Sequence, residues 1–130
     1  MNVPEKLLYT SEHEWVKMEE GQKATVGITA YAQEQLGDIA FIELPEVGKS
    51  VKQFDEICSI ESIKAASDVY APLSGKVVEV NKKLESSPQL INSSPYQDGW
   101  IVKIEISDPN EKDKLMNSID YHAFLNRPEK

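Results

Sequence analysis

The stretch Glu61-Ser-Ile-Lys-Ala-Ala-Ser-Asp68 connects two short segments, 57–61 and 68–71, whose composition predicts β-strands. A connection that only reverses the chain would favour Asn-Gly, Asp-Gly or Gly-Gly, and this one contains no glycine. It places Lys64 at or near the tip of a predicted hairpin, followed by small residues. We therefore expect an exposed amine that is held by two strands.

Lys64 is a candidate for acylation because its amine can be deprotonated in the grip of an enzyme, which an arginine does not allow. Acylation would convert the ammonium into an amide and remove its charge. Most lysines lie on solvated faces, so the turn alone leaves an ordinary surface residue as the alternative.

A short internal repeat surrounds this hairpin. Pro45-Glu-Val-Gly-Lys-Ser-Val51 and Pro72-Leu-Ser-Gly-Lys-Val-Val78 share the pattern Pro-x-x-Gly-Lys-x-Val, and the stretch around Glu61 lies midway between them. A duplicated strand-turn-strand unit would form a pseudo-twofold β-sandwich with the hairpin at its centre. The pattern is short, and chance remains the alternative.

The flanking sequence is also rich in predicted strands. Alternation predicts a strand over 24–29, and a short helix follows over 30–36, with Thr29 as its cap and Gly37 in the left-handed turn at its end. Further strands are predicted over 39–44, 51–54, 76–80 and 100–106, the last with Trp100, Val102, Ile104 and Ile106 facing the core. The segment 84–99 is rich in Ser and Pro and is predicted to be mostly loop.

The last part of the chain is predicted to be helical. Asp108-Pro-Asn-Glu111 has the residues of a helix start, with Asp as cap, Pro at the first position and Glu three residues after the cap. Leu115, Met116 and Ile119 would form an apolar stripe, and a second short helix around 121–125 would end before Pro128.

Length and charge limit the functional classes. The chain has 130 residues, which fits one domain, and its net charge of −8 disfavours nucleic acid and anionic membranes as partners. Cys58 is the single cysteine, so an internal disulfide is excluded, which suits a reducing compartment. Residues 1–10 show no targeting pattern, so we expect a cytoplasmic protein, and a processed mitochondrial form would look the same.

Five blocks carry a resemblance to a known family: Ser11-Glu-His-Glu-Trp-Val16, 28–38, 43–48, 61–75 and Ile91-Asn-Ser-Ser-Pro-Tyr-Gln-Asp-Gly-Trp100. In this order and spacing they resemble the H proteins of the glycine cleavage system. The resemblance runs from about residue 9 to 106, with a weaker match in the helical tail.

The resemblance implies a mostly β fold, a lipoyl-domain-like flattened barrel or sandwich of two antiparallel sheets with short helices. The whole chain, 1–130, would form a single lipoyl-carrier domain, with a core at about 9–106 and a C-terminal helical segment at about 108–126. Lipoate would be attached covalently to Lys64. Related biotin carriers usually have Met on both sides of the lysine, and Ile63 and Ala65 here favour lipoate.

The resemblance also implies a carrier that is not itself an enzyme. It would receive the aminomethyl group of glycine from a decarboxylase that uses pyridoxal phosphate (PLP) and deliver it to a tetrahydrofolate-dependent aminomethyltransferase. Dihydrolipoyl dehydrogenase, with FAD and NAD, would reoxidise it, and a lipoate-attaching enzyme would load it. The alternative function is an octanoyl or lipoyl relay to other lipoyl-dependent enzymes, and a third is a binding module with no modification.

By the same resemblance, Glu14 and Asp68 would line a cleft that shields the arm, although they could also be plain surface carboxylates or turn caps. Glu12 stands where family members often have Ser, which adds a negative charge near the cleft. Glu56 and Glu61 are candidates for recognition by the lipoate-attaching enzyme. His13 is expected to be structural, Cys58 a small buried hydrophobe, and no metal site is expected because His and Cys are scattered.

Overall fold

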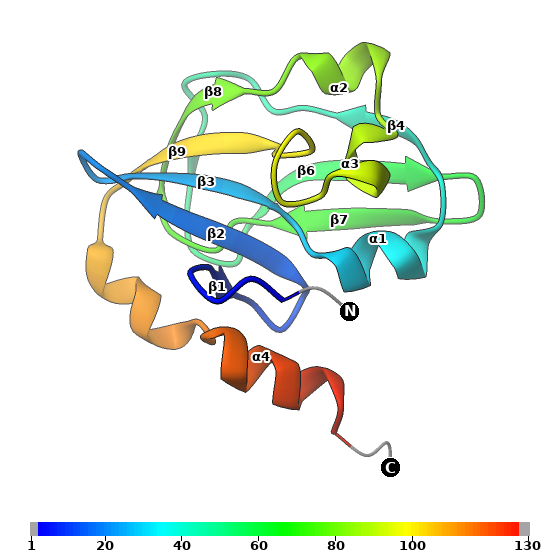
Figure 1. Ribbon diagram of the computed structural model, residues 1–130. Coiled ribbons are helices and arrows are strands. Elements are labelled where there is room, and N and C mark those ends of the chain that lie inside the picture. The colour runs from blue at the N-terminus through cyan, green and yellow to red at the C-terminus, as the bar shows by residue number, and fades with distance from the viewer. Residues whose placement is uncertain (1–2, 128–130) are drawn as a thin grey trace.

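The computed structural model describes residues 3–127, and its strands form two antiparallel sheets (Figure 1). The six-stranded sheet has the order β1 (Leu8–Tyr9), β2 (Glu14–Glu19), β3 (Lys23–Ile28), β9 (Val102–Ile106), β8 (Gly75–Val80) and β5 (Ser50–Val51). The three-stranded sheet has the order β4 (Ile39–Glu43), β6 (Glu56–Ser62) and β7 (Ala66–Tyr70). The predicted mostly β fold is confirmed as a sandwich rather than a closed barrel.

The two sheets bury one apolar core between them. Alternate side chains of a strand point to opposite faces, so each sheet can supply one apolar face. Val26, Ile104 and Val77 come from the larger sheet, and Ile60 and Val69 come from the smaller one, and all five are buried. The smaller sheet is thereby fixed along its length, including the strands that lead into the Lys64 turn.

The two copies of the repeat are neighbours in the larger sheet. Ser50 pairs with Lys76 and Val51 with Gly75. Two further backbone bonds extend the contact, from Gly48 N to Val77 O at 2.7 Å and from Val77 N to Lys49 O at 2.8 Å. The strand predicted over 51–54 is shorter than expected, because a turn follows Val51 and Phe54 has a φ of 70°.

Helix α1 (Ala30–Leu36) has the predicted bounds and N-cap, and Gly37 ends it with a positive φ, although its ψ of −159° lies outside the left-handed helical region that was predicted. The Thr29 hydroxyl accepts a hydrogen bond from Ala32 N, and Gly37 has a φ of 78°. The predicted loop at 84–99 was wrong in part, because it contains the single-turn helices α2 (Lys83–Ser86) and α3 (Leu90–Ser93). Neither has a side-chain cap; each is held by one buried side chain, Leu84 or Ile91, which a sequence rich in Ser and Pro conceals.

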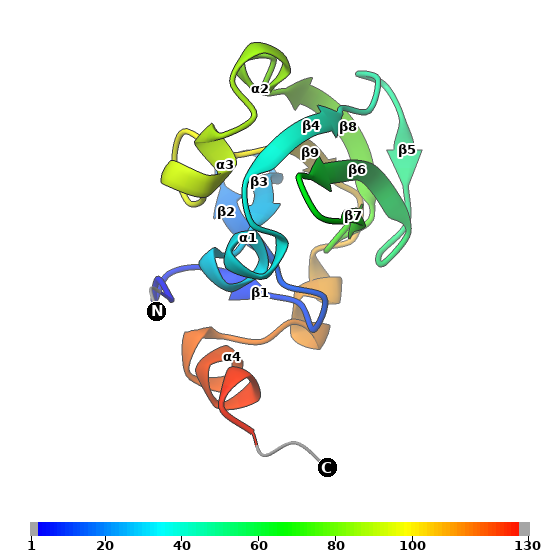
Figure 2. The same ribbon diagram turned by 90° about the vertical axis from the view of Figure 1, so that its right-hand side faces the viewer.

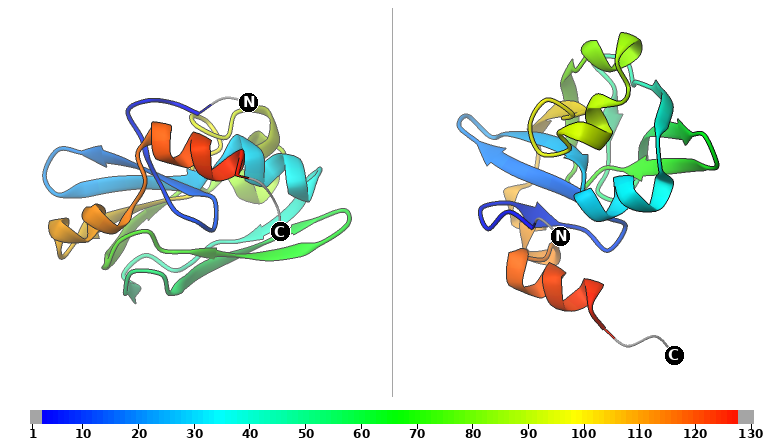
Figure 3. Two further views of the ribbon diagram at one scale, coloured as in Figure 1. Left: turned by 90° about the horizontal axis from the view of Figure 1, so that it is seen from below. Right: turned by 45° about the vertical axis from the view of Figure 1, so that its right-hand side comes forward.

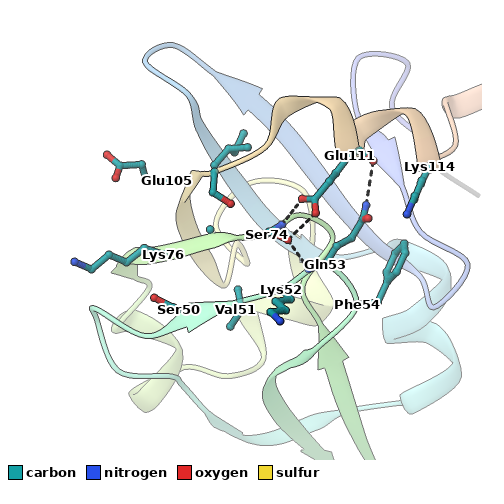
Figure 4. A pocket seen from close by; sticks show the side chains of 13 residues that line it. Ser50, Val51, Lys52, Gln53, Phe54, Ser74, Lys76, Glu105, Glu111 and Lys114 are labelled. Atoms are coloured by element: carbon teal, nitrogen blue, oxygen red, sulfur yellow. Dashed lines mark hydrogen bonds between the residues drawn. The ribbon is translucent and has the colours of Figure 1, made fainter.

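The segment after Asp108 is the 3-10 helix η1 (Pro109–Lys114), and Asp108 caps it by accepting from Asn110 N. Glu111 does not close a capping box. Its carboxylate instead accepts hydrogen bonds from the backbone N and the hydroxyl of Ser74, both at 2.7 Å, and so ties η1 to the loop before β8 (Figure 4).

Helix α4 (Ser118–Leu125) confirms the second helix, while Pro128 lies outside the described residues. Ile119 was wrongly placed in an apolar stripe, because it is 77% exposed and Tyr121 is the residue that α4 buries. The Tyr121 ring stacks on Tyr9, with centroids 4.5 Å apart.

This stacking belongs to a second apolar cluster, separate from the core between the sheets. Its buried members are Leu7, Tyr9, Trp15 and Tyr121. Strand β2, which carries Trp15, was not predicted, since its first three residues are all buried and its last three all exposed. That pattern hides the alternation on which strand prediction relies.

The Lys64 turn and η1 lie at opposite ends of the molecule. Figure 1 shows the β6–β7 hairpin projecting beyond α1 at the right, with η1, in orange, at the left, and the view from below in Figure 3 agrees. The hairpin therefore stands at the end of the sandwich opposite η1.

Candidate functional site

Lys64 lies in the bend between β6 and β7 and is exposed, as predicted from the missing turn glycine. Its side chain makes no ion pair or hydrogen bond within residues 3–127. Ile63 beside it is 73% exposed. The amine is thus accessible and is not engaged by a carboxylate of the described chain.

The bend is shaped by a hydroxyl group rather than by unusual backbone angles. The Ser62 hydroxyl accepts hydrogen bonds from Lys64 N at 3.2 Å and from Ala65 N at 3.0 Å. Ser62 N donates to Ala65 O at 2.8 Å and closes the turn. None of these residues has a positive φ. A serine side chain can satisfy turn amides in this way, so no glycine is needed.

The bend is also attached to the turn between α1 and β4. Ile63 N donates to Asp38 O at 3.0 Å. A Cβ added to Gly37 would lie 3.4 Å from Lys64 Cε, so the lysine methylenes pass over the bare Cα of this glycine. Figure 2 shows α1 and the start of β4 beside the hairpin. The sequence predicted Gly37 only as a helix end, and nothing in it signalled the contact with Lys64.

Glu14 is 1% exposed and lies inside the protein rather than on its surface. One carboxylate oxygen accepts from the Thr10 hydroxyl at 2.5 Å, and the other accepts from Tyr70 N at 3.1 Å. Burial raises the pKa of Glu14 to about 7, against the lowering effect of these two hydrogen bonds. The carboxylate therefore links β2 to the base of the lysine-bearing hairpin. Thr10 and Tyr70 were not predicted to belong to the site.

The charges of nearby carboxylates act on Tyr70. The negative charge of Asp68 is the main cause that raises the pKa of Tyr70, followed by burial and then by Glu12, Glu56 and Glu14. Two of these residues also meet Tyr70 through the backbone: Tyr70 N donates to Glu14, and Glu56 of β6 is in register with Tyr70 of β7. Asp68 is four residues from Lys64 along the chain, or about 13 Å at the usual rise of a strand.

Glu61 is separate from this group. It lies exposed near the end of β6, in register with Phe41 on one side and Ala66 on the other. It is therefore closer to the bend than Glu56, which begins the strand. The two residues predicted for enzyme recognition lie at opposite ends of β6.

His13 and Cys58 are placed as structural residues. His13 Nδ1 lies 2.8 Å from the Tyr121 hydroxyl, and burial lowers the pKa of the imidazole. Cys58 is a buried free thiol whose pKa is raised to about 12, chiefly by burial. Within residues 3–127, no three His, Cys, Asp or Glu side chains are grouped so that they could hold a metal ion.

A surface hollow of about 650 Å³ lies at the other end of the molecule, between β5, β8 and η1 (Figure 4). Gln53 crosses it, donating from its amide to Pro72 O and Glu111 O, both at 3.0 Å. None of the predicted site residues lines this hollow. In the part of the chain that is described, no helix has the length and hydropathy needed to cross a membrane.

Comparison with known proteins gives the same family throughout. A family model described as Glycine cleavage H-protein matches residues 7–128. The glycine cleavage system H protein of Symbiobacterium thermophilum is 56% identical over 123 residues, or 95% of each chain. That of Pectobacterium carotovorum subsp. carotovorum is 55% identical over 128 residues, or 98% of each chain. A crystal structure of a glycine cleavage system H protein from Mycobacterium marinum superimposes with a TM-score of 0.86 at 36% identity, over 95% of this chain and 98% of that one.

The paired sheets, the short helices and the lysine displayed on a hairpin define a lipoyl-domain-like β-sandwich. The family match spans nearly all of the chain. The chain belongs to the glycine cleavage H-protein family.

Proposed function

We propose that the chain is the lipoyl carrier of a glycine cleavage system and that Lys64 forms the amide with lipoate. The observation that supports this most is the exposed Lys64 amine, free of ion pairs in the described chain, on a bend held by the Ser62 hydroxyl and by Asp38 O of the α1–β4 turn. Such an amine fits amide formation, since no carboxylate must be displaced first. The whole chain would act as one carrier domain.

The lipoyl group would supply a disulfide that accepts electrons and a thiol that holds the aminomethyl group of glycine. The protein would meet three enzymes in turn: the PLP-dependent decarboxylase, the tetrahydrofolate-dependent aminomethyltransferase and the FAD- and NAD-dependent dihydrolipoyl dehydrogenase. It would be their cosubstrate and not a catalyst. A tether keeps its end at high local concentration near whichever enzyme has docked. The lone cysteine suits a cytoplasmic location.

Asp68 and Glu14 would form the site that shields the cationic cargo. Asp68 is the exposed member on the lysine-bearing strand, and Glu14 would support it from within by fixing Tyr70 N. In this proposal Glu14 stabilises the strand that carries Asp68 and does not contact the cargo itself, since both its oxygens have protein partners. Glu61, near the bend, and Glu56, at the far end of β6, would be read by the lipoate-attaching enzyme.

The attachment is tested by the intact mass of the protein after co-expression with lipoylation enzymes and supplied lipoate. We expect one lipoyl adduct on the wild type, none on Lys64→Ala, and an unchanged adduct on Lys52→Ala, which removes an exposed lysine elsewhere. An unmodified wild type would contradict the proposal. Transfer of the acyl group from the loaded protein to a separate lipoyl domain would identify it as a relay instead.

The shielding role needs its own measurement. Asp68→Asn should release the loaded one-carbon group to water faster than the wild type, while Asp98→Asn, remote from the hairpin, should not. Equal release rates for Asp68→Asn and the wild type would remove Asp68 from the site. The rate of lipoylation of Glu56→Gln and Glu61→Gln, compared with Glu79→Gln, tests the recognition residues in the same way.

A further inference from the structure

The side-chain amide of Asn92, in α3, makes hydrogen bonds with both its oxygen and its nitrogen around one turn of the protein. Its Oδ1 accepts from Ile39 N at 2.9 Å, and its Nδ2 donates to Gly37 O and to Gln33 Oε1, each at 2.9 Å. Gln33 lies in the middle of α1, Gly37 directly follows this helix, and Ile39 begins β4. One side chain therefore holds both sides of the turn at Asp38.

That turn is the one on which the lysine-bearing bend rests. Asp38 O, between the two residues whose backbone Asn92 bonds, accepts the hydrogen bond of Ile63 N. Gly37 supplies the bare Cα beneath the Lys64 methylenes. Asn92 is thus connected to the bend by two successive contacts, although it lies 28 positions further along the chain than Lys64.

The turn needs such a support because its backbone is unusual. Gly37 has φ 78° and ψ −159°, a region that residues other than glycine rarely visit. Without Asn92, Gly37 O and Ile39 N would lose their partners at this point. Helix α3 is itself fixed in the fold, since Ile91 is fully buried and the backbone of Gly99 packs closely against the helix.

We infer that Asn92 is a positioning residue for Lys64: by fixing the Gly37–Ile39 turn, it sets where the bend presents its amine to the lipoate-attaching enzyme. The inference rests on the proposed acylation of Lys64. A bend that is already ordered loses less entropy when an enzyme docks on it, so the gain appears as tighter binding of the carrier.

Amide hydrogen exchange tests the support without any enzyme. In Asn92→Ala, the Ile63 amide should exchange roughly five to ten times faster than in the wild type, as expected when the loss of the Asn92 bonds weakens the Ile63–Asp38 contact by about the net contribution of one hydrogen bond. The matched control is Gln53→Ala, because Gln53 Nε2 also donates to two backbone carbonyls, those of Pro72 and Glu111, but at the opposite end of the molecule. It should leave Ile63 unchanged. Unchanged Ile63 exchange in Asn92→Ala would overturn the inference.

Kinetics of lipoylation test the consequence. With the carrier as varied substrate, Asn92→Ala should raise KM about tenfold with a smaller change in kcat, and Gln53→Ala should behave as the wild type. Asn92→Asp keeps the acceptor for Ile39 N and should give a smaller rise in KM; it also serves if Asn92→Ala does not fold. If the wild type is lipoylated and both Asn92 variants have the same KM as the wild type, the inference about Asn92 is overturned and the proposed function stands. If the wild type is never lipoylated, the proposed function is overturned as well.

Discussion

The two tight hairpins of the sandwich reverse the chain by different means. Between β2 and β3, Gly21 and Gln22 have φ values of 72° and 60°, and a Cβ added to Gly21 would meet nothing within 4 Å. Between β6 and β7 no residue has a positive φ, and the bend is held by the Ser62 hydroxyl and by Asp38 O. The first turn reverses through left-handed backbone angles, with one bond from Ile106 N to Gln22 O at 2.7 Å, whereas the second reverses without them and is held by a side chain and by the neighbouring turn.

The difference indicates what each turn is for. Left-handed residues match the twist of a tight hairpin, so the β2–β3 turn needs no side-chain hydrogen bond to its amides, and its residues 20–22 are exposed. The β6–β7 bend uses side-chain and tertiary contacts, which fix the direction in which Lys64 leaves the sheet. A Thr–Glu pair lies near the base of each hairpin: the buried Thr25 hydroxyl donates to the exposed Glu19 in one case, and the buried Thr10 hydroxyl donates to the buried Glu14, which contacts Tyr70 N, in the other.

Replacing the amine should give the largest effect. Lys64→Arg should fold normally yet lose lipoylation and glycine cleavage completely, because a guanidinium stays protonated and cannot form the amide. Activity in a reconstituted system, with circular dichroism to check the fold, measures this. Lys23→Arg, at the start of β3 beside the other turn, should keep full activity; any glycine cleavage supported by Lys64→Arg would contradict the role of Lys64.

The buried Glu14 should make stability depend on pH. Its pKa is raised from 4.5 to about 7, so the folded state holds an extra proton in this window and the free energy of unfolding falls as pH rises through it. At about 1.4 kcal/mol per pKa unit, Glu14→Gln should be more stable than the wild type at pH 8 by up to roughly 3 kcal/mol, with the gain vanishing near pH 4.

Urea unfolding across this pH range is the measurement, and the exposed Glu19→Gln of the other hairpin is the control. A difference between Glu14→Gln and the wild type that does not change with pH would show that the Glu14 carboxyl does not titrate in this window.

Adding a methyl group should distinguish the two turns. Gly37→Ala should lower the free energy of unfolding by about 2 kcal/mol because of its backbone angles. It should also slow lipoylation, since the new Cβ lies against Lys64 Cε. Gly21→Ala, with a similar φ but open surroundings, should cost about 1 kcal/mol and leave lipoylation unchanged. Equal lipoylation rates in both variants would mean that the Gly37 contact has no effect on the lysine.

Removing the hydroxyl of the bend should have the smallest effect. Ser62→Ala leaves two exposed amides, which water can solvate, so the free energy of unfolding should fall by only about 1 kcal/mol. Gln22→Asn, which suits a positive φ, should stay within about 0.5 kcal/mol of the wild type. Thermal unfolding measures both, and a Ser62→Ala variant as stable as the wild type would show that the strands alone hold the bend.

The parts of the fold predicted from sequence are those where local chemistry and tertiary position agree. Strand β3, helix α1 with Thr29 and Gly37, and helix α4 each show their own period or caps. Helices α2 and α3 exist because Leu84 and Ile91 enter the core, which is a tertiary cause. Glu111 was expected to cap its own helix, but its carboxylate accepts hydrogen bonds from Ser74 instead, which is a tertiary contact.

The candidate site was likewise predicted from the sequence only in part. The exposure of Lys64 followed from a turn without glycine, and the family resemblance indicated its role. The burial of Glu14 was not predicted, since it depends on Thr10 and on the strand that brings Tyr70 against it. Asp38 acts through its carbonyl and Gly37 through the absence of a side chain, so neither has a signal that residue type alone could reveal.

The second apolar cluster joins the first strand to the last helix through Tyr9 and Tyr121, and among residues 3–127 it includes none from β4, β6 or β7. Groups of residues that pack together tend to open together. The two extremities of the chain should therefore detach and reattach as one cooperative unit, while the sheet that carries Lys64 stays folded. A substitution that destabilises one end of the chain should then first increase local opening at the other end, and should affect the lysine-bearing hairpin last.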